Sequence, residues 1–374
     1  MKELLYQLWL GSLHGISTAR VHRLYQHFGS FSAIYEADMS EYVKVEGIGM
    51  QSPLFNKDLD NARRILEDCD RLGIDIISYY NERYPKRLKE IDNSAPAQLF
   101  VRGKLPPVDK VLTIAVVGAR RSSPYGNACA TQIAQELGRA GAVVVSGMAR
   151  GIDSAAHRGA LKADAATIAV LGCGVDVCYP PENKELKRVI ESNGAVISEL
   201  PPFSQPLAVN FPARNRIISG ISVATVIVEG KATSGSTITA RLSMEQGRET
   251  FCVPGCIDKE LSVGPHQLIR DGARLITSAK DIIIDLAKDY PELMVDVMLG
   301  DEAQERIAGT QHEKLPREQK MVIGVLKDNF PTHIDEIWHR TALETAVVNQ
   351  SLLMLEINGL ITSLPGKQYI LRSK

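Results

Sequence analysis

Six apolar runs of strand length recur through the middle of the chain, and helix-length amphipathic segments separate most of them. The runs are continuous rather than alternating, and they occupy residues 112–117, 142–146, 167–171, 195–198, 223–228 and 250–253. Continuous apolar strands are typical of a parallel sheet that is covered by helices on both faces. The pattern therefore predicts an α/β fold with a Rossmann-like, doubly wound parallel sheet as its core.

The first 75 residues follow a different pattern, with apolar positions at helical spacing. Leu4, Leu8 and Trp9 begin this pattern, and a Gly-Ile-Gly turn at 47–49 lies between two predicted helices. This predicts an N-terminal helical domain, residues 1–75, of the SAM or helix-hairpin-helix kind. Its turn amides could meet a DNA phosphate, although any pair of antiparallel helices needs such a glycine.

Two further segments frame the predicted sheet. Residues 76–108 are rich in proline and tyrosine and contain two short predicted strands, at 74–80 and 97–103. We expect them to form an N-terminal extension of a core domain that spans residues 76–287. Residues 288–315 are polar and lack periodicity, which predicts a linker.

The last 59 residues, 316–374, predict three helices followed by a hairpin, which is the order of a winged helix. The helix at the position of a recognition helix, 342–358, carries Glu344 and Glu356 and no lysine or arginine. A helix that reads the major groove needs cations toward the phosphates. We therefore expect a protein-interaction or regulatory domain here rather than a reader of duplex DNA.

Composition narrows the class of protein. The chain has 374 residues, 44% hydrophobic and 23% charged, with a formal net charge of −1, so any basic surface must be local. The six cysteines form no CxxC pair and have no histidine at zinc spacing, which predicts reduced thiols, no metal and a cytoplasmic protein. No signal-peptide pattern or apolar run of membrane-spanning length is present, so we expect no membrane association.

Glycine-containing loops follow the predicted strands, at 118–126, 146–153, 172–176 and 229–237. Most of them combine a glycine, which lets backbone approach a ligand, with a cation or a hydroxyl that can bind an anionic oxygen. Ligands of a doubly wound sheet bind at the carboxyl ends of the strands, where the strand order reverses. The loops therefore predict a phosphate-binding rim at that edge.

The segment 211–220 adds two arginines that flank an asparagine. Pro212 predicts a helix start, which would place Arg214, Asn215 and Arg216 in the first turn. Free N–H groups and the helix dipole favour an anion at that turn.

We expect the polar residues in the neighbouring loops to orient, cap or bind rather than to catalyse. No acidic residue lies within 203–228, and we expect Glu229 to orient one of the two arginines and Asp153 to cap a helix. Ser234 and Ser236 are interpreted as phosphate-binding hydroxyls at a helix N-terminus rather than as nucleophiles.

The usual nucleotide fingerprints are absent. Residues 118–123 do not form GxGxxG, and no GxxxxGK[ST] loop occurs. Residues 233–240 resemble a loop of the nucleotide phosphoribohydrolases, but Ala240 stands where those enzymes carry a glutamate. Without that carboxylate the reaction lacks its general catalyst, so we expect no enzyme and no cofactor. The alternatives left open are a nucleotide-binding enzyme or sensor of that group, and a pure interaction scaffold.

Together, these motifs resemble those of the DNA-processing protein A (DprA/Smf) family. The segments that carry the resemblance are 117–122, 146–153, 211–218, 234–240 and 245–248. The resemblance implies a Rossmann-like core that binds single-stranded DNA and forms a homodimer. It also implies a recombination mediator that displaces single-strand binding protein and loads the RecA recombinase during natural transformation.

The resemblance also implies which residues bind the strand. Phosphates would be held by cations and an asparagine, and backbone and hydroxyl groups would add contacts. Independently of the resemblance, Phe211 could stack on a base or equally pack in the core. The residues expected to bind DNA are Gly118, Arg120, Arg121, Ser122, Gly147, Arg150, Phe211, Arg214, Asn215, Arg216, Lys231, Ser234, Gly235 and Ser236. Some relatives carry a lysine just before the phenylalanine, whereas residues 207–210 of this chain are Leu-Ala-Val-Asn.

Overall fold

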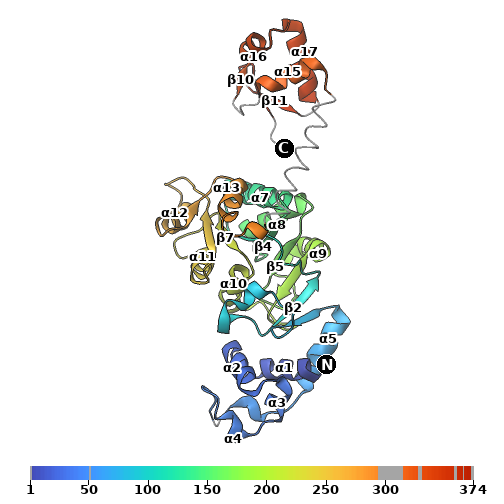
Figure 1. The fold of residues 1–374 in the computed structure, drawn as a ribbon, viewed down its shortest axis with the longest axis vertical. Coiled ribbons are helices and arrows are strands. Elements are labelled where there is room, and N and C mark those ends of the chain that lie inside the picture. Colours follow the sequence, from blue (N-terminus) through green and yellow to red (C-terminus); the bar gives the residue numbers. More distant parts are fainter. Residues whose placement is uncertain are drawn as a thin grey trace. The chain divides into compact units, whose positions relative to one another are not determined.

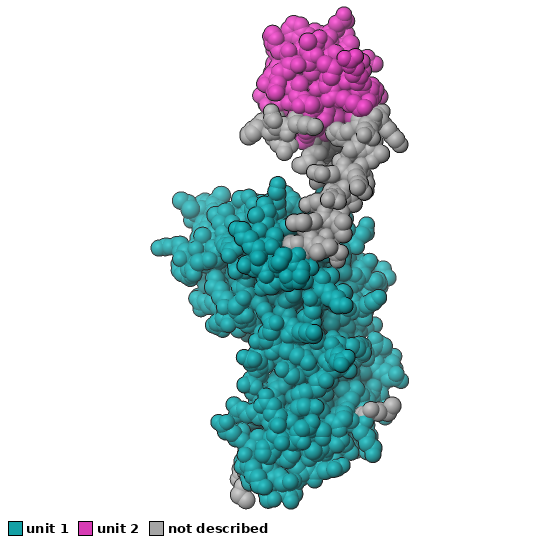
Figure 2. All heavy atoms as spheres, in the orientation of Figure 1, with its two compact units in different colours: residues 1–300 teal, residues 301–374 magenta. Residues whose placement is uncertain are grey.

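The computed structural model describes residues 2–49, 52–293, 315–326, 331–357, 360–364 and 366–371. The chain divides into two compact units, residues 1–300 and 301–374 (Figure 2). Most of the predicted linker, 288–315, lies outside the described residues. The domain boundaries expected at 75, 287 and 315 stay predictions.

The first unit is built on a nine-stranded sheet with the order β1-β2-β6-β5-β4-β3-β7-β8-β9 (Figure 1). All neighbours from β6 to β9 pair in parallel, while β1 and β2 join the edge in antiparallel orientation. The strands are β1 Asp75–Ser78, β2 Gln98–Gly103, β3 Thr113–Val117, β4 Val143–Ser146, β5 Thr167–Val170, β6 Ala195–Ser198, β7 Ala224–Ile227, β8 Glu249–Cys252 and β9 Arg274–Leu275. The predicted α/β fold is confirmed.

The strand order reverses between β3 and β7. From β3 the chain proceeds outward through β4, β5 and β6, and it then returns to form β7 on the other side of β3. The carboxyl ends of β3 and β7 therefore lie side by side, while the segments that follow them lead away in opposite directions. This is the crevice at which ligands of open parallel sheets bind.

Helices cover both faces of the sheet, as the continuous apolar strands require. One face packs against α7 Pro124–Arg139, α8 Ile152–Lys162 and α13 Ala279–Leu286. The other packs against α6 Lys86–Lys89, α10 Asn210–Gly220, α11 Gly235–Glu245 and α12 Val263–Arg270. Helices α7 and α8 approach closely because Gly159 has no side chain: a Cβ there would collide with the carbonyl oxygen of Thr131.

The N-terminal segment is helical, as its pattern predicts. It contains α1 Lys2–Ser12, α2 Thr18–Phe28, α3 Phe31–Glu36, α4 Met39–Tyr42, the 3-10 turn η1 Pro53–Phe55 and α5 Asp60–Leu72. Its apolar side chains share one hydrophobic cluster with the sheet and with α9 Lys184–Asn193. Two buried polar groups also connect it to the chain before β2. Gln7 donates from Nε2 to the carbonyl oxygen of Ala97 at 2.6 Å, and His22 Nε2 lies 2.9 Å from that of Ala95.

Short 3-10 turns complete the first unit: η2 Asp92–Ser94, η3 Pro181–Asn183, η4 Glu260–Ser262 and η5 Pro291–Leu293. None of the described helices has both the length and the apolar character needed to cross a membrane.

The second unit has the elements of a winged helix, and that prediction is confirmed. They are α15 Arg317–Val325, β10 Thr332–His333, α16 Ile334–Thr341, α17 Thr345–Ile357, β11 Ile361–Leu364 and β12 Gln368–Leu371. The three strands pair in the order β10-β12-β11. Val322, Ile337, Leu352 and Ile361 lie in its hydrophobic core.

Candidate functional site

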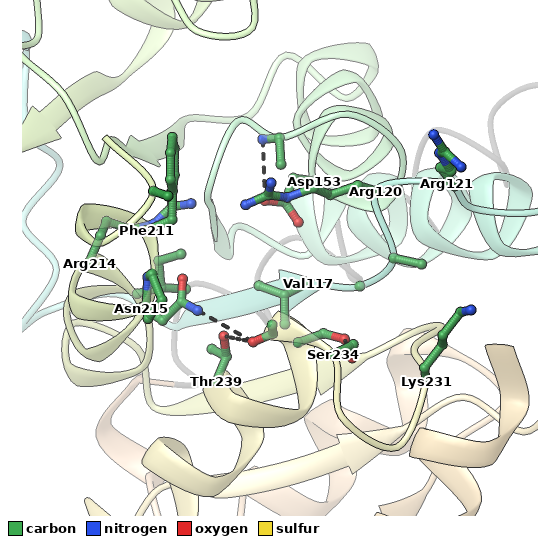
Figure 3. Close-up of a pocket in the computed structure, with 18 of the residues that line it drawn as sticks. Val117, Arg120, Arg121, Asp153, Phe211, Arg214, Asn215, Lys231, Ser234 and Thr239 are labelled. Atoms are coloured by element: carbon green, nitrogen blue, oxygen red, sulfur yellow. Dashed lines mark hydrogen bonds between the residues drawn. The ribbon is translucent and has the colours of Figure 1, made fainter. Parts of the chain in front are cut away.

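A cavity of about 500 Å³ opens at the carboxyl ends of β3 and β7, where the strand order reverses. Its walls come mainly from the loops after these two strands and from α10, with further residues from the segments that follow β4, β5 and β6 (Figure 3). Ten of the fourteen residues expected to bind DNA line it: Gly118, Arg120, Arg121, Phe211, Arg214, Asn215, Lys231, Ser234, Gly235 and Ser236. Three of the four loops singled out in the sequence therefore meet at one place, while 172–176 contributes no residue to the wall.

The loop after β3 contributes two exposed arginines, Arg120 and Arg121. Within the described part of the chain neither forms an ion pair, although Arg120 is near enough to Asp153 to lower the pKa of that carboxyl, against the larger effect of its burial. Both guanidinium groups line the cavity, where an anion can reach them. The Arg120 guanidinium lies 5.3 Å from the ring centroid of Phe211, a distance at which a cation and an aromatic face attract. At the start of this loop Gly118 is required, because a Cβ would lie 2.5 Å from Ile152 Cγ1.

Helix α10 carries Arg214, and the structure gives this arginine a different environment from the expected one. The helix begins at Asn210, two residues before Pro212, so Arg214 lies beyond the first turn. Only 4% of the residue is exposed. Its Nη1 donates to the carbonyl oxygens of Gly147, at 2.8 Å, and Val170, at the ends of β4 and β5. The Nη1 group is therefore used inside the protein, while the buried Nε has no hydrogen-bond partner among the described residues.

Asp153 is the anionic neighbour of Arg214. It lies in the first turn of α8, whose N-cap residue is Gly151, so the expectation that Asp153 caps this helix is wrong. Burial lowers the pKa of Arg214 to about 10, and the Asp153 carboxylate opposes that shift. Burial likewise raises the pKa of Asp153, against the opposing effect of the Arg214 cation. The two groups thus support each other's charge in a largely buried part of the cavity wall.

The loop after β7 places hydroxyl groups at the N-terminus of α11. Ser234 is the N-cap, and its Oγ accepts a hydrogen bond from the Thr237 N–H at 3.4 Å. The same Oγ lies 2.7 Å from Ser236 Oγ. Since the first N–H groups of a helix have no partner within it, this turn presents donors toward the cavity.

Two side chains of the cavity wall donate hydrogen bonds to this turn (Figure 3). Asn215 donates from Nδ2 to the carbonyl oxygen of Gly235 at 3.3 Å, and Thr239 donates from Oγ1 to the same oxygen at 3.0 Å. Ala240, one residue further on, is fully buried. Ala240 therefore does not line the cavity.

Most of the remaining cations are paired. Lys231, in the cavity wall, lies 2.6 Å from Glu260 Oε1. Arg150 forms a two-point contact with Glu182, with Nη2 and Oε2 3.1 Å apart. The side chains of both pairs are at least half exposed. An incoming phosphate can therefore compete with the glutamate for the cation.

Four of the expected residues do not line the main cavity. Gly147 and Arg150 line a small adjoining pocket of about 30 Å³, together with Arg120, Phe211 and Arg214. Ser122 donates from Oγ to Asn127 Oδ1 at 2.8 Å. Gly147 and Arg150 thus border the cavity without forming its wall, whereas Ser122 lines neither of the two pockets.

Arg216 is the fourth, and it points away from the cavity. Its Nη1 and Nη2 lie 2.8 and 2.6 Å from the two carboxylate oxygens of Glu199. Glu199 lies just before the acid-free window 203–228, so the sequence argument missed this partner. The expectation that Glu229 orients one of the two arginines is wrong. Glu229 instead accepts hydrogen bonds from the N–H and the hydroxyl of Ser123.

Sequence reasoning also missed Tyr179 and Thr239 as parts of the wall. The Tyr179 ring centroid lies 5.4 Å from that of Phe211, which extends the aromatic surface beside Arg120. Tyr179 follows β5 at the same edge of the sheet, so the rule that placed the other loops could have found it. Among the described residues, no group of three or more potential ligands could hold a metal ion.

Comparison with known families gives two matches that together cover most of the chain. The model of the family described as DNA recombination-mediator protein A matches residues 75–287, and a DprA winged helix domain matches residues 308–367. Among curated proteins, the chain is 31% identical to Protein Smf of a Synechocystis species, over 98% of both chains. It is 44% identical to the DNA processing protein DprA of Streptococcus pneumoniae, over 56% of this chain and 73% of that protein.

Two solved structures are similar to the fold. The X-ray structure of DNA processing protein A from Streptococcus pneumoniae has a TM-score of 0.65 and 35% identity, covering 75% of this chain and 97% of that one. The corresponding protein of Helicobacter pylori, whose structure was described for its mode of binding single-stranded DNA, has a TM-score of 0.52 and 31% identity. That match covers 58% of this chain and 97% of the Helicobacter protein.

Proposed function

This chain belongs to the DNA recombination-mediator protein A (DprA/Smf) family, and from that membership we propose that it binds single-stranded DNA at the cavity between β3 and β7. The observation that carries the proposal is the pairing of two exposed, unpaired arginines with a hydroxyl-lined helix N-terminus across one cavity. Arg120 and Arg121 supply charge, and the turn at Ser234 supplies oriented donors. Both recognise phosphate oxygens, so binding should not depend on base sequence.

No carboxylate among the described residues of the cavity wall is free to act as an acid or base on a bound nucleotide. The buried Ala240 stands where the phosphoribohydrolases carry a glutamate. Asp153 is the carboxylate in the wall, but it faces Arg214 and accepts the Ala149 N–H at 3.3 Å. General acid–base catalysis needs a group within reach of the proton it moves. We infer a binding protein rather than an enzyme, with no cofactor.

A nucleotide sensor is the second candidate, because a cavity of about 500 Å³ has the volume of a small-molecule site. The two functions differ in how affinity depends on strand length. A strand-binding site gains affinity from each further phosphate, whereas a sensor binds a mononucleotide as tightly as an oligonucleotide. A thermal-shift comparison of nucleoside monophosphates with oligo-dT separates them.

The oligomeric state and the role in recombination are suggested by family membership and are part of the proposal. We infer a cytoplasmic homodimer that removes single-strand binding protein from a strand and loads RecA during transformation or recombination. Light scattering should then give twice the mass of the 41.0 kDa chain. RecA ATP hydrolysis on a strand coated with single-strand binding protein should start sooner when this protein is added. The mass of a monomer would contradict the homodimer. An unchanged delay before RecA ATP hydrolysis begins would contradict RecA loading.

Strand binding is tested by fluorescence anisotropy with labelled oligo-dT and a matched duplex. In the variant Arg120→Ala/Arg121→Ala we expect affinity for oligo-dT to fall about 10- to 100-fold. For every phosphate that the variant no longer neutralises, the slope of log affinity against log salt should become shallower by about 0.7. Both side chains are exposed, so the variant should fold normally, which circular dichroism checks. A variant that binds as well as the wild type would refute the proposed site.

A further inference from the structure

The loop between β6 and α10 places aliphatic side chains in solvent beside the cavity. We call residues 206–209, Pro-Leu-Ala-Val, the apolar lip. Pro206 and Ala208 line the cavity, whereas Leu207 and Val209 are 59% and 72% exposed. Alternate residues thus face the cavity and the solvent, so the lip forms one border of the opening.

Hydrogen bonds on both sides hold this loop in place. Before the lip, the Phe203 N–H donates to both carboxylate oxygens of Asp176, at 3.0 and 3.2 Å. Within it, the carbonyl oxygen of Leu207 accepts the N–H of Asn210, the first residue of α10, at 3.0 Å. The exposure of Leu207 and Val209 is therefore a property of an ordered turn, where burial against a ligand would be favourable.

Charge changes abruptly across the opening. Residues 204–213 contain no lysine, arginine, aspartate or glutamate, so the lip offers no charge to a phosphate. On the other side of Phe211, the Arg120 guanidinium lies over the ring, and Arg121 follows it. A ligand that spans both surfaces must be anionic on one side and apolar on the other.

We propose that the apolar lip receives the bases of a DNA strand whose phosphates lie at Arg120 and Arg121, and that it provides the preference for single strands over duplex. This rests on the proposed function. A single strand presents its phosphates and the flat faces of its bases to different surfaces. In a duplex the bases are stacked and paired, so they reach an external aliphatic surface only if they are flipped out. The duplex can use the arginines but not the lip.

A second protein is a poorer fit to the same surface. Stable protein interfaces bury about 800 Å² on each partner, far more than Leu207 and Val209 present. The adjoining surface is a cationic cavity, which would have to be desolvated as well. Two aliphatic side chains match the size of one or two bases.

The test compares wild type with Leu207→Ser/Val209→Ser, in the full chain, on three labelled ligands of equal length. These are oligo-dT, an abasic strand with the same phosphates, and a duplex. The variant should bind oligo-dT about 5- to 10-fold more weakly and should bind the abasic strand and the duplex within about 2-fold of wild type. Ile257→Ser, which changes a side chain that is 93% exposed on another loop, is the matched control and should alter none of the three.

Three results for Leu207→Ser/Val209→Ser would overturn the inference. The first is unchanged affinity for oligo-dT, and the second is an equal loss of affinity for all three ligands. The third is a change in the mass of the variant by light scattering, which would assign the lip to a contact between copies of the chain. Failure of the proposed function looks different. In that case the wild type itself would not bind oligo-dT, or Arg120→Ala/Arg121→Ala would bind it normally.

Discussion

The edge of the sheet at β3 and β7 and the winged helix are two regions whose folds can each present a helix to nucleic acid, but they differ in charge. At the sheet edge, exposed arginines stand beside the N-terminus of α11. On the winged helix, α17 contains no lysine or arginine, and its exposed face includes Leu353 and Met354. A fold supplies a shape, and the side chains placed on it decide whether that shape attracts a polyanion.

The two regions also differ in what they bury. The first unit buries Arg214, Asp153 and His157, whereas the buried polar residues in the described part of the second unit are all uncharged. They are Gln319, Thr332, Thr341 and Ser351. Buried charges and titratable groups make stability sensitive to substitution and to pH. The first unit should therefore respond to both more strongly than the second.

The largest effect should come from Arg214→Ala. This change leaves the buried Asp153 carboxylate without the cation that lowers its pKa most, and it removes the donor to Gly147 and Val170. Removing one partner of a buried charge pair costs about 3–5 kcal/mol of unfolding free energy. Urea unfolding followed by Trp9 fluorescence measures the loss, in a Trp338→Phe background that leaves Trp9 as the reporter of the first unit.

Arg216→Ala is the matched control on the same helix. Arg216 pairs with Glu199 through side chains that are 16% and 21% exposed, so its loss should cost about 1.5–3 kcal/mol, less than that of the more deeply buried Arg214. Equal losses for the two variants would mean that burial of Arg214 does not set its importance. Weak DNA binding by either variant must be read against these stability changes.

Acid should destabilise the first unit by the next largest amount. His157 is fully buried, and burial lowers its pKa to about 3, well below its ordinary value of 6.5. Between these values the unfolded chain binds a proton that the folded chain does not, so unfolding free energy falls as pH decreases below about 6.5. From pH 7 to pH 5 the loss should be about 2 kcal/mol.

The difference between wild type and His157→Gln isolates this contribution from that of Asp153, whose raised pKa acts in the opposite direction. Urea unfolding at pH 7 and pH 5, again followed by Trp9, gives both values. If wild type and variant lose the same stability on acidification, His157 is not the responsible group.

A smaller effect, of opposite sign, should follow from removing the glutamates that pair with the cations of the site. Glu260→Gln frees Lys231, and Glu182→Gln frees Arg150. Exposed ion pairs are worth up to about 1 kcal/mol, so each change should raise affinity for oligo-dT about 2- to 5-fold at low salt. The gain should shrink at high salt, where exposed charges are screened.

The control for these variants is Glu185→Gln. Its partner Arg188 lies on α9, and the pair is 73% and 70% exposed. Anisotropy with oligo-dT should detect no change for this variant. A similar gain at all three positions would indicate a response to net charge rather than to the freed cations.

Much of this arrangement was predictable because local pattern determines it. The six strands of the core appear within one residue of their apolar runs, and β9 was missed because Arg274 and Leu275 form no run. The loops of the site were predictable from their position after parallel strands. They converge because the sheet brings the carboxyl ends together, whatever their distance in sequence.

The pairing of the cations was not predictable, since it depends on packing. Glu182 lies 32 residues from Arg150, and Glu199 lies 17 residues from Arg216. One error, however, could have been avoided. Arg214 and Arg216 are two positions apart on α10, and helical residues at that spacing point about 200° apart. Both could not face the same cavity.

The smallest effect should come from the winged helix, where Arg317→Ala/Lys367→Asn removes two cations from the second unit. Asparagine is chosen at 367 because Lys367 has a φ of 55°, which asparagine tolerates. If strands bind at the sheet edge, affinity for oligo-dT should change by less than about 2-fold, with the salt slope unaltered. Fluorescence anisotropy with oligo-dT, measured in parallel for this variant and for Arg120→Ala/Arg121→Ala, gives a direct comparison because each variant loses two positive charges. A loss as large as that of the Arg120/Arg121 variant would place the winged helix in the strand-binding surface, and the charge contrast between the two regions would no longer explain where DNA binds.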